Sequence, residues 1–520
     1  MCLKVTVKRA ACMVLALIML VAAAGCGENK ETTKKKKKII TKKVVIVETD
    51  DNSVKVDDTS SATDNYQEND NTVTEDDFET VYVRREVTGE VANQVEPQEK
   101  QYSTEKASLN ITNEHIIVYS DENVYAHQNA VNLQNYFSKE GLNLTVAEDD
   151  KVSWGSKLIV VGDTKFAESK LTENAFAVTA YGDNLLFAGG HFAMVETAVD
   201  WFTTLAFEKG KVNLVSGTVS SFSSTKTTSR GTYDYVWGDD FSGNYLDTNK
   251  WRVGLMTTPE STLCATPDNC PEAINVSDGL LKTKAMRYYN DEYPQYQYAK
   301  PGSISTDDSM GYLFGYAELR VRMTFKRGIW PAWWGINTGC GGLGTVLGPA
   351  NPYDYGYEID IFEVFSSTST LTPNIHKWYK DNSYGRTHTQ YNEGYRQSNK
   401  YVFEDISNLN NEYHTYGFEW TDKEMIMSVD GDEYWTVNLD SNYDGLADME
   451  ALRNSPIKFI LGPGICTSDN GDAQENWILN NEDLPFYFWV DYIRLYQNKQ
   501  QSGNKLYVKD ADGGVYSWWN

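Results

Sequence analysis

Three carboxylates lie close together in the stretch YGYEIDIFEVF, which runs from Tyr355 to Phe365. Glu358 and Asp360 are two residues apart, so in a β-strand their side chains share one face. Glu363 follows Glu358 by five residues, an odd offset that sends its side chain to the opposite face of a regular strand. Carboxylates that converge on one face can supply the nucleophile and the general acid that cut a sugar linkage.

A β-bulge would bring all three acids to one face. One extra residue between Asp360 and Glu363 makes two residues act as one and restores the alternation. Glu358 and Glu363 are then four strand positions apart, roughly 13 Å, and inward-leaning side chains close this to the about 5–5.5 Å of a retaining glycosidase. Asp360 lies between them and holds their titrations apart. The alternative is a row of solvent-facing acids on an ordinary strand.

The sequence around these acids is dense in short segments of β-strand type. They include GYAELRVRM, YHTYGFEW, EMIMSV, EYWTV, IKFILGP and FYFWVDYIRLY, and long helical periodicity is absent. Asp430 and Gly431 form a tight hairpin turn between two of them. Many short antiparallel strands in one domain predict a β-sandwich.

These segments resemble the family 16 glycoside hydrolases, whose signature is Glu-Ile-Asp-Ile-x-Glu in its bulged form. VWGDDFSGNYLDTNKWRV resembles the family's opening strand, and GYLFGYAELRVRMTFKRGIWPAWWGIN resembles its substrate-lining strands. NEYHTYGFEWTDKEMIMSVDGDEYW and PFYFWVDYIRLYQ resemble its closing segments, so the likeness runs from Trp237 to Gln497. The resemblance implies a mainly β, concanavalin-like jelly-roll sandwich whose concave sheet forms a sugar-binding cleft.

The resemblance assigns a role to each acid. Glu358 would be the nucleophile, Glu363 the general acid/base and Asp360 the assisting carboxylate, with no cofactor required for catalysis. The expected activity is that of a retaining endo-glycosidase on β-linked glucan, most of all β-1,3-glucan of the laminarin type. Mixed-linkage β-1,3-1,4-glucan and the galactans agar and carrageenan are alternatives within the family. A glycan-binding protein that does no chemistry is the rival from another class, and the three intact acids argue against it.

Two tryptophans are candidates for the wall of the cleft. In GIWPAWWGIN, Trp330 and Trp334 are an even distance apart and share a face, where both can stack on sugars. Trp333 then faces the other sheet. The alternative is that all three belong to the core of the sandwich.

The resemblance points to four more residues. Arg320 stands where the family has a cleft arginine, with a surface charge as the alternative. His376 follows the catalytic strand and would contact the leaving sugar, with Trp378 on the same face. Asp491 in WVDYIRLY resembles a position that ligates a structural calcium on the convex side, and a hard ion of this kind prefers oxygen ligands.

A smaller α/β domain is expected ahead of the sandwich. HIIVYS and KLIVVGD are strand-type runs, Ala130, Leu133 and Phe137 recur at helical spacing, and AFAVTAYGDNLLFAGG predicts two strands joined by a turn. The segment resembles the non-catalytic α/β domain of hexosaminidase- and α-glucuronidase-type glycosidases. The predicted organisation is a signal at 1–25, a disordered tether at 26–107, the α/β domain at 108–222, a linker at 223–231, the catalytic domain at 232–497 and a C-terminal tail at 498–520.

The N-terminus predicts export. Lys4, Lys8 and Arg9 precede a short apolar run, and AAGC resembles the bacterial lipoprotein cleavage box, with lipid attached to Cys26. The alternative is a transmembrane helix, but the run is shorter than the roughly 20 residues that span a bilayer. We therefore expect an exported protein, lipid-anchored at the bacterial cell surface.

The composition of the chain limits the classes of binding partner that we expect. The formal net charge of −26 argues against nucleic acid, which calls for basic patches. Aromatic residues make up 13% of the chain, which suits a polysaccharide partner because flat rings stack on sugars. A monomer is expected. Cys264 and Cys270 could form a small disulfide loop or remain free thiols, and no His or Cys spacing completes a zinc site.

Overall fold

The structure is a computed structural model. It has two compact units, Met1–Asn93 and Gln94–Asn520. It describes residues 46–48, 54–56, 100–121, 123–254, 261–292, 294–337, 346–353, 355–365, 371–379, 406–439, 450–466, 479 and 483–518. In the first unit, β1 (Ile46–Glu48) pairs antiparallel with β2 (Val54–Val56). All elements named below belong to the second unit.

The predicted signal and Cys26 lie outside the described residues, and so does most of the predicted tether. Within the part of the chain that the structure describes, no helix has the length and apolar character needed to cross a membrane.

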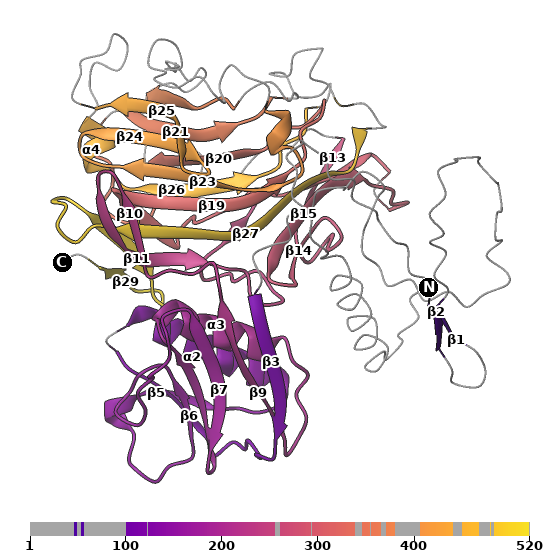
Figure 1. The fold of residues 1–520 in the computed structure, drawn as a ribbon, viewed down its shortest axis with the longest axis vertical. Helices are drawn as coiled ribbons and strands as arrows, with labels where there is room; N and C mark the ends of the chain where they lie inside the picture. The colour runs from indigo at the N-terminus through magenta and orange to yellow at the C-terminus, as the bar shows by residue number, and fades with distance from the viewer. Residues whose placement is uncertain are drawn as a thin grey trace, which may run out of the picture. The chain divides into compact units, whose positions relative to one another are not determined.

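A seven-stranded mixed sheet with two helices forms the N-terminal part of the second unit (Figure 1). In sheet order its strands are β3 (Lys100–Ala107), β9 (Val212–Val219), β7 (Ala175–Tyr181), β8 (Asn184–Gly189), β6 (Leu158–Val161), β4 (Ile116–Tyr119) and β5 (Thr145–Glu148). Its helices are α2 (Val124–Lys139) and α3 (Phe192–Thr203), and a short 3-10 helix spans Asp149–Lys151. The prediction of a small α/β domain is confirmed.

Helix α2 follows from its sequence pattern. Ala130, Leu133 and Phe137 are fully buried on one helix face, as their spacing predicts. At the N-terminus, the Asn123 side chain accepts a hydrogen bond from the Tyr125 backbone N–H at 2.9 Å, which satisfies one of the free donors of the first turn.

Two larger sheets form the β-sandwich. Among the described residues, the first has eleven strands: β13 (Thr262–Ala265), β16 (Tyr298–Pro301), β15 (Leu280–Arg287), β27 (Phe486–Gln497), β19 (Gly315–Met323), β23 (Tyr413–Trp420), β24 (Glu424–Val429) and β25 (Asp432–Asn438) in order, with β10 (Thr225–Thr228), β11 (Gly231–Asp239) and β14 (Ile274–Ser277) beside this path. The second has nine: β22 (Asn374–Tyr379), β21 (Tyr355–Glu363), β20 (Ala332–Asn337), β26 (Ile457–Gly462), β18 (Met310–Leu313), β28 (Lys505–Lys509) and β29 (Val515–Ser517), with β12 (Arg252–Val253) and β17 (Ile304–Ser305). Short helices span Ser407–Leu409 and Glu450–Asn454.

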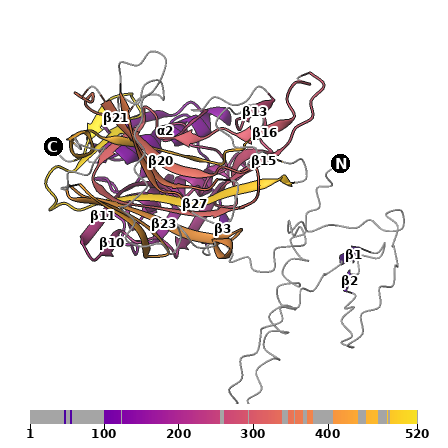
Figure 2. The same ribbon diagram turned by 90° about the horizontal axis from the view of Figure 1, so that it is seen from above.

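Both sheets contribute to one hydrophobic core, so each has an inner and an outer face. Leu319 and Val321 of β19 and Ile359 of β21 belong to this core. Figure 2 shows β20 and β21 of the nine-stranded sheet together with β23 and β27 of the eleven-stranded sheet. The architecture is mainly β with an additional α/β domain, as predicted.

Two segments differ from the predicted organisation, and strands also form in the C-terminal tail, to which no role was assigned. The last eight residues of the predicted tether form β3, whose backbone pairs with β9 along its whole length. The Ser/Thr-rich linker contains β10, because its β-branched threonines suit the antiparallel pairing with β11. The C-terminal tail adds β28 and β29 to the nine-stranded sheet.

Candidate active site

The predicted bulge lies in β21. Trp334 of β20 pairs with Asp360, whereas the preceding Trp333 pairs with Phe362, so Ile361 is an extra residue on β21. The bulge between Asp360 and Glu363 is therefore confirmed. It breaks the strict alternation at the point where the third acid would otherwise change face.

Burial along β21 shows how the faces are arranged. Tyr357 and Ile359 are fully buried in the core between the sheets, and so are both Ile361 and Phe362. Two consecutive core residues shift the alternation by one. Glu363 therefore returns to the face that carries Glu358 and Asp360, which is the outer face of the nine-stranded sheet.

The neighbouring strand confirms which face this is. Trp334 and Ile336, which pair with Asp360 and Glu358, lie with Ile460 in a small hydrophobic cluster separate from the main core. Trp333, which directly precedes Trp334, is fully buried in the main core, as predicted.

A tyrosine from the opposite sheet contacts the bulge. Tyr434 of β25 is fully buried, and its hydroxyl donates a hydrogen bond of 2.5 Å to the backbone carbonyl oxygen of Ile361. The bulge carbonyl thus has a partner inside the core, where an unsatisfied carbonyl would be costly.

Glu363 lies in an environment that favours its protonated form. Burial raises the pKa of Glu363 well above its usual range, and the negative charges of Asp360 and Glu358 raise the pKa further. A hydrogen bond of 2.8 Å from the Trp330 indole Nε1 to Oε1 opposes this rise and fixes the orientation of the carboxyl group. A protonated, oriented carboxyl group is what a general acid requires.

Asp360 is the most buried of the three acids, with 2% of its surface exposed. Burial and the negative charge of Glu358 raise its pKa well above the usual range. Its Oδ2 lies 3.0 Å from Nε2 of His376, a residue that pairs directly with Glu358 across β21 and β22. The hydrogen-bond partner of that ring nitrogen is the side-chain amide Nδ2 of Asn374, at 3.0 Å.

Glu358, Asp360 and His376 offer oxygen and nitrogen atoms that all lie within 4.8 Å of one another. Such a set could hold a divalent cation, but the same two carboxylates belong to the acid constellation. We therefore treat the three residues as one part of the candidate active site.

The structure brings some of the predicted substrate residues to the acids. Trp330 is half-buried beside Glu363, Trp334 is 7% exposed opposite Asp360, and His376 contacts Asp360. Trp378 pairs through its backbone with Gly356, and its side chain lies outside the described residues.

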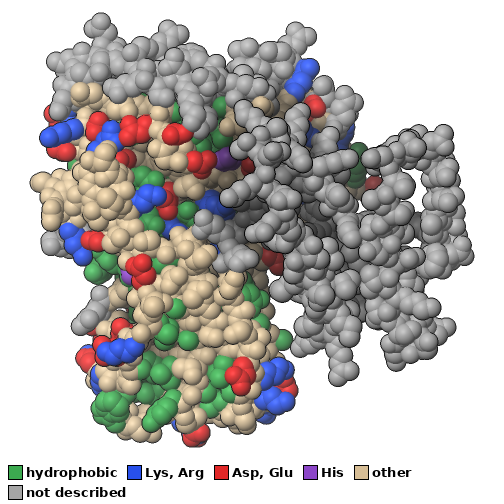
Figure 3. All heavy atoms as spheres, viewed as in Figure 1, with side chains coloured by type: hydrophobic (Ala, Val, Ile, Leu, Met, Phe, Trp, Pro, Cys, Tyr) green, Lys and Arg blue, Asp and Glu red, His purple; other side chains and the backbone are tan. Residues whose placement is uncertain are grey.

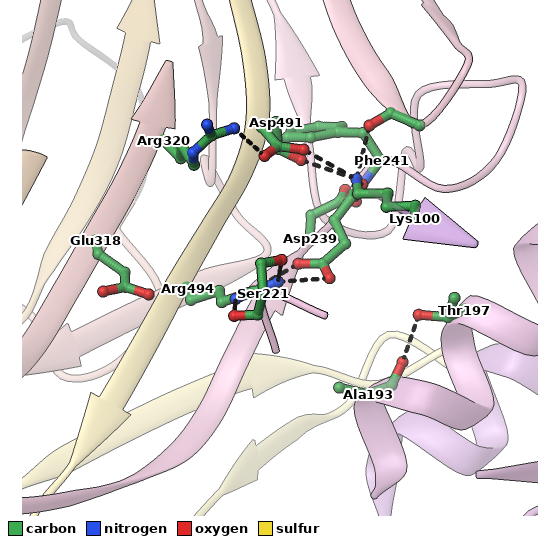
Figure 4. A network of polar contacts seen from close by, with 12 residues as sticks. Lys100, Ala193, Thr197, Ser221, Asp239, Phe241, Glu318, Arg320, Asp491 and Arg494 are labelled. Atoms are coloured by element: carbon green, nitrogen blue, oxygen red, sulfur yellow. Dashed lines mark hydrogen bonds and ion pairs between the residues drawn. The ribbon is translucent and has the colours of Figure 1, made fainter. Parts of the chain in front are cut away.

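Arg320 does not lie with the acids. Its neighbours Leu319 and Val321 point into the core, so Arg320 faces the outer side of the eleven-stranded sheet, away from β21. There its Nη1 donates to Oδ2 of Asp491 at 2.6 Å (Figure 4). The prediction that Arg320 lines the cleft is wrong, because strand alternation places it on the opposite side of the sandwich.

The predicted calcium ligand Asp491 has two cationic neighbours. Its Oδ2 accepts from Arg320, and its Oδ1 lies 3.3 Å from Nζ of Lys100. Backbone carbonyl oxygens that would complete a calcium shell hydrogen-bond to the same Lys100 ammonium. The residues present therefore do not fit a calcium ion at this position.

Cys264, Cys270 and Cys466 are free thiols, so the open choice between a disulfide and free thiols is decided for Cys264 and Cys270. Two interacting residues escaped the sequence analysis altogether. For Tyr434, the sequence indicated only that the side chain points inward from a strand of a hairpin. Lys100 lies in a segment that was predicted to be part of the tether.

One family model matches part of the sandwich. Residues 273–469 match the family model described as Glycosyl hydrolases family 16, and this range includes β20, β21 and β22 with all three acids. This part of the chain is therefore similar to that family. The matched residues therefore contain the bulged strand, whereas Lys100 and Asp491 lie outside them.

Several curated proteins are similar to about half of the chain. The chain is 26% identical over 283 residues to glucan endo-1,3-beta-glucosidase A1 of Niallia circulans, which covers 51% of the chain and 38% of the relative. It is 21% identical to keratan-sulfate endo-1,4-beta-galactosidase of Sphingobacterium multivorum, over 55% of the chain and 59% of the relative. It is 25% identical to beta-glucanase of Rhodothermus marinus, over 51% of the chain and 85% of the relative. The chain spans less than two thirds of the first two relatives.

Comparison of the whole chain with solved structures gives low TM-scores. The laminarinase from Rhodothermus marinus has a TM-score of 0.36 at 22% identity, covering 51% of this chain and 97% of that chain. The laminarinase catalytic domain from Thermotoga petrophila has a TM-score of 0.35 at 22% identity, covering 52% and 99%.

Proposed function

We propose that the family 16 domain is a retaining endo-glycoside hydrolase that cuts β-linked glucan, with β-1,3-glucan as its main substrate. The observation that carries this proposal is the extra residue at Ile361, which returns Glu363 to the face of Glu358 and Asp360. An ordinary strand would have separated the acids. A protein that only binds glycans has no need of this convergence.

The first chemical step uses two of the acids. Glu358 attacks the anomeric carbon, and the glycosidic bond breaks as Glu363 gives its proton to the departing oxygen. The product is a covalent glycosyl-enzyme, with Glu363 now ionised. The raised pKa of Glu363 supports its role as the proton donor, and Trp330 keeps the carboxyl group oriented.

The second step reverses the roles. Ionised Glu363 takes a proton from water, the water oxygen bonds to the anomeric carbon, and Glu358 leaves as a carboxylate. Two inversions at one carbon keep the anomeric configuration. Asp360, held neutral by burial and by the charge of Glu358, assists by keeping the negative charge on Glu358.

The substrate assignment is supported by two relatives, one named a glucan endo-1,3-beta-glucosidase and the other a beta-glucanase. Trp330, Trp334, His376 and Trp378 are the proposed sugar contacts. Mixed-linkage glucan and galactans remain the alternative substrates, and the relative that acts on keratan sulfate favours including a galactan in any test. The net charge of −26 disfavours sulfated chains.

We also propose that the protein is exported, acts as a monomer and is held at the cell surface by lipid on Cys26. On the face shown in Figure 3, acidic and basic side chains are intermixed over the sandwich, without a broad basic area that would suit nucleic acid. Replacing Cys26 by alanine should move the protein from the membrane fraction to the medium, whereas Cys264→Ala should not.

A panel of laminarin, lichenan, agarose and carrageenan tests the activity, with product sizing to establish endo cleavage. Wild type should release a ladder of oligosaccharides from laminarin first, and Glu358→Gln should release almost none. Glu433→Gln is the matched control, because this exposed carboxylate lies on β25 of the other sheet and pairs with Arg230. Equal product release by wild type and Glu358→Gln would contradict the role of Glu358 as the nucleophile, and no release by either would leave only a binding role.

A further inference from the structure

Four oxygen atoms of the sandwich surround the ammonium group of Lys100, which comes from β3 of the α/β domain (Figure 4). The backbone carbonyl oxygens of Asp240, Gly279 and Asp491 accept its hydrogen bonds, at 2.7 Å for Gly279 and 3.2 Å for Asp491. The fourth atom is Oδ1 of the Asp491 carboxylate, 3.3 Å from Nζ. Three carbonyls and one carboxylate form the donor set that a hard cation prefers.

The charges in this cluster are buried. The Asp491 side chain is fully buried, and only 7% of the Lys100 side chain is exposed. Arg320 donates to the other oxygen of the same carboxylate, so Asp491 already lies between two positive groups. A divalent ion added to this arrangement would meet two cations and one anion, and Coulomb repulsion would oppose it.

The surrounding backbone is shaped around the lysine chain. Gly279 has a φ of +71°, which an L side chain rarely adopts. A Cβ atom at this position would lie 3.0 Å from Cδ and 3.5 Å from Nζ of Lys100. Gly279 therefore permits both the turn between β14 and β15 and the close approach of the lysine.

We infer that the Lys100 ammonium is a built-in cation that replaces a metal ion at Asp491 and joins the α/β domain to the sandwich through it. The lysine supplies positive charge and three N–H donors to oxygens that would otherwise need a bound ion. The wild-type chain is therefore stable without calcium, and removal of the lysine opens a calcium site made of the same oxygens. The inference does not depend on the proposed hydrolysis.

Thermal unfolding of the full chain tests this inference. Wild type should unfold at the same temperature in EDTA and in calcium chloride. Lys100→Ala should unfold at a lower temperature in EDTA, and calcium should raise its unfolding temperature by roughly 5 °C at a hundredfold excess over the dissociation constant. Magnesium should act more weakly, because it dehydrates reluctantly and demands stricter geometry.

Lys106→Ala is the matched control, since it removes the same charge from the same strand at an exposed ion pair with Glu208. If calcium stabilises wild type as strongly as Lys100→Ala, or if Lys100→Ala responds no more than Lys106→Ala, the inference is overturned. Should the alanine variant not fold, Lys100→Gln replaces it: its neutral side chain is one bond shorter and leaves room beside Asp491. The same calcium response is expected there, and its absence would also overturn the inference.

Discussion

Glu363 combines burial, neighbouring negative charge and a fixed hydrogen bond. The first two raise its pKa, and the third, from Trp330, holds the carboxyl group in one orientation. Glu358 lies on the same strand face but pairs with His376 on β22 instead. Two carboxyl groups of similar chemistry thus have different surroundings, which is the usual way in which an acid and a nucleophile are distinguished.

Glu363→Gln should lower kcat on laminarin by about 10²–10⁴-fold, because the amide cannot protonate the leaving oxygen. An aryl β-glucoside oligosaccharide with an acidic phenol as leaving group needs little protonation, so formation of its glycosyl-enzyme should remain fast in the variant. We expect a rapid burst of phenol release followed by slow turnover. An equal loss on both substrates in the burst phase would contradict the acid role.

Asp360→Asn should move the alkaline limb of the pH profile to lower pH. The first step needs protonated Glu363, so activity falls as pH rises through the pKa of Glu363. On the alkaline limb, once Asp360 has lost its own proton, its negative charge is one cause of the raised pKa of Glu363, and replacing Asp360 by asparagine lowers that pKa. The measurement is kcat/KM against pH, which reports the free enzyme. Asp278→Asn, at an exposed turn, should leave the limb in place, and an unmoved limb in Asp360→Asn would refute this electrostatic role.

At the scale of the element, β21 depends on a hydrogen bond from the opposite sheet. Tyr434→Phe removes the donor to the Ile361 carbonyl, which should lower the free energy of unfolding by about 1–3 kcal/mol and reduce kcat. Denaturant unfolding and steady-state kinetics on laminarin measure both effects.

Tyr312→Phe is the control for this variant. Tyr312 is also fully buried in the core, and its hydroxyl has no hydrogen-bond partner among the described residues. Removal of the Tyr312 hydroxyl should change the free energy of unfolding and kcat less than Tyr434→Phe does. A normal kcat in Tyr434→Phe would mean that the bulge holds its shape without this contact.

The sequence could predict β21 and its bulge because strand alternation is a local rule with a period of two. An odd spacing between Glu358 and Glu363 stands out against it, and one inserted residue is the simplest correction. The same rule, applied to Leu319 and Val321, would have placed Arg320 on the outer face. Arg320 was instead assigned to the cleft because of the family resemblance, and this placed it on the wrong side of the sandwich.

At the scale of the whole molecule, the contact between α3 and the sandwich contains buried acids. Lys250 binds Glu196 of α3 by an ion pair. Burial raises the pKa of Glu196 to about 7, and the charges of Asp239 and Asp247 add to the rise, while Lys250 opposes it. These long-range contacts could not be read from sequence, because they join residues of two domains.

Glu196→Gln should flatten the dependence of stability on pH. Between the ordinary value of 4.5 and about 7, folded Glu196 keeps a proton that the unfolded chain releases, so stability falls as pH rises through this range and levels off above it. The variant removes this contribution. Unfolding free energies from pH 4.5 to 8 measure it, and Glu168→Gln, an exposed acid, should retain the wild-type slope. An unchanged slope in Glu196→Gln would contradict the assignment.

Lys100 illustrates the limit of sequence reasoning at this scale. Lys100 begins β3, whose sequence is polar and whose side chains are mostly exposed, so composition favoured a tether. Distant parts of the chain supply both the strand β9, with which β3 pairs, and the oxygen atoms around the Lys100 ammonium group.

The most direct test of the account is the anomeric configuration of the first product. Proton NMR of laminarin digested by the wild-type chain in deuterated buffer should show the β-anomer first, with the α-anomer appearing later by mutarotation. That order is the result of two displacements at one carbon by convergent Glu358 and Glu363. An α-anomer formed first would mean direct attack by water, and the geometry proposed for β21 would be contradicted.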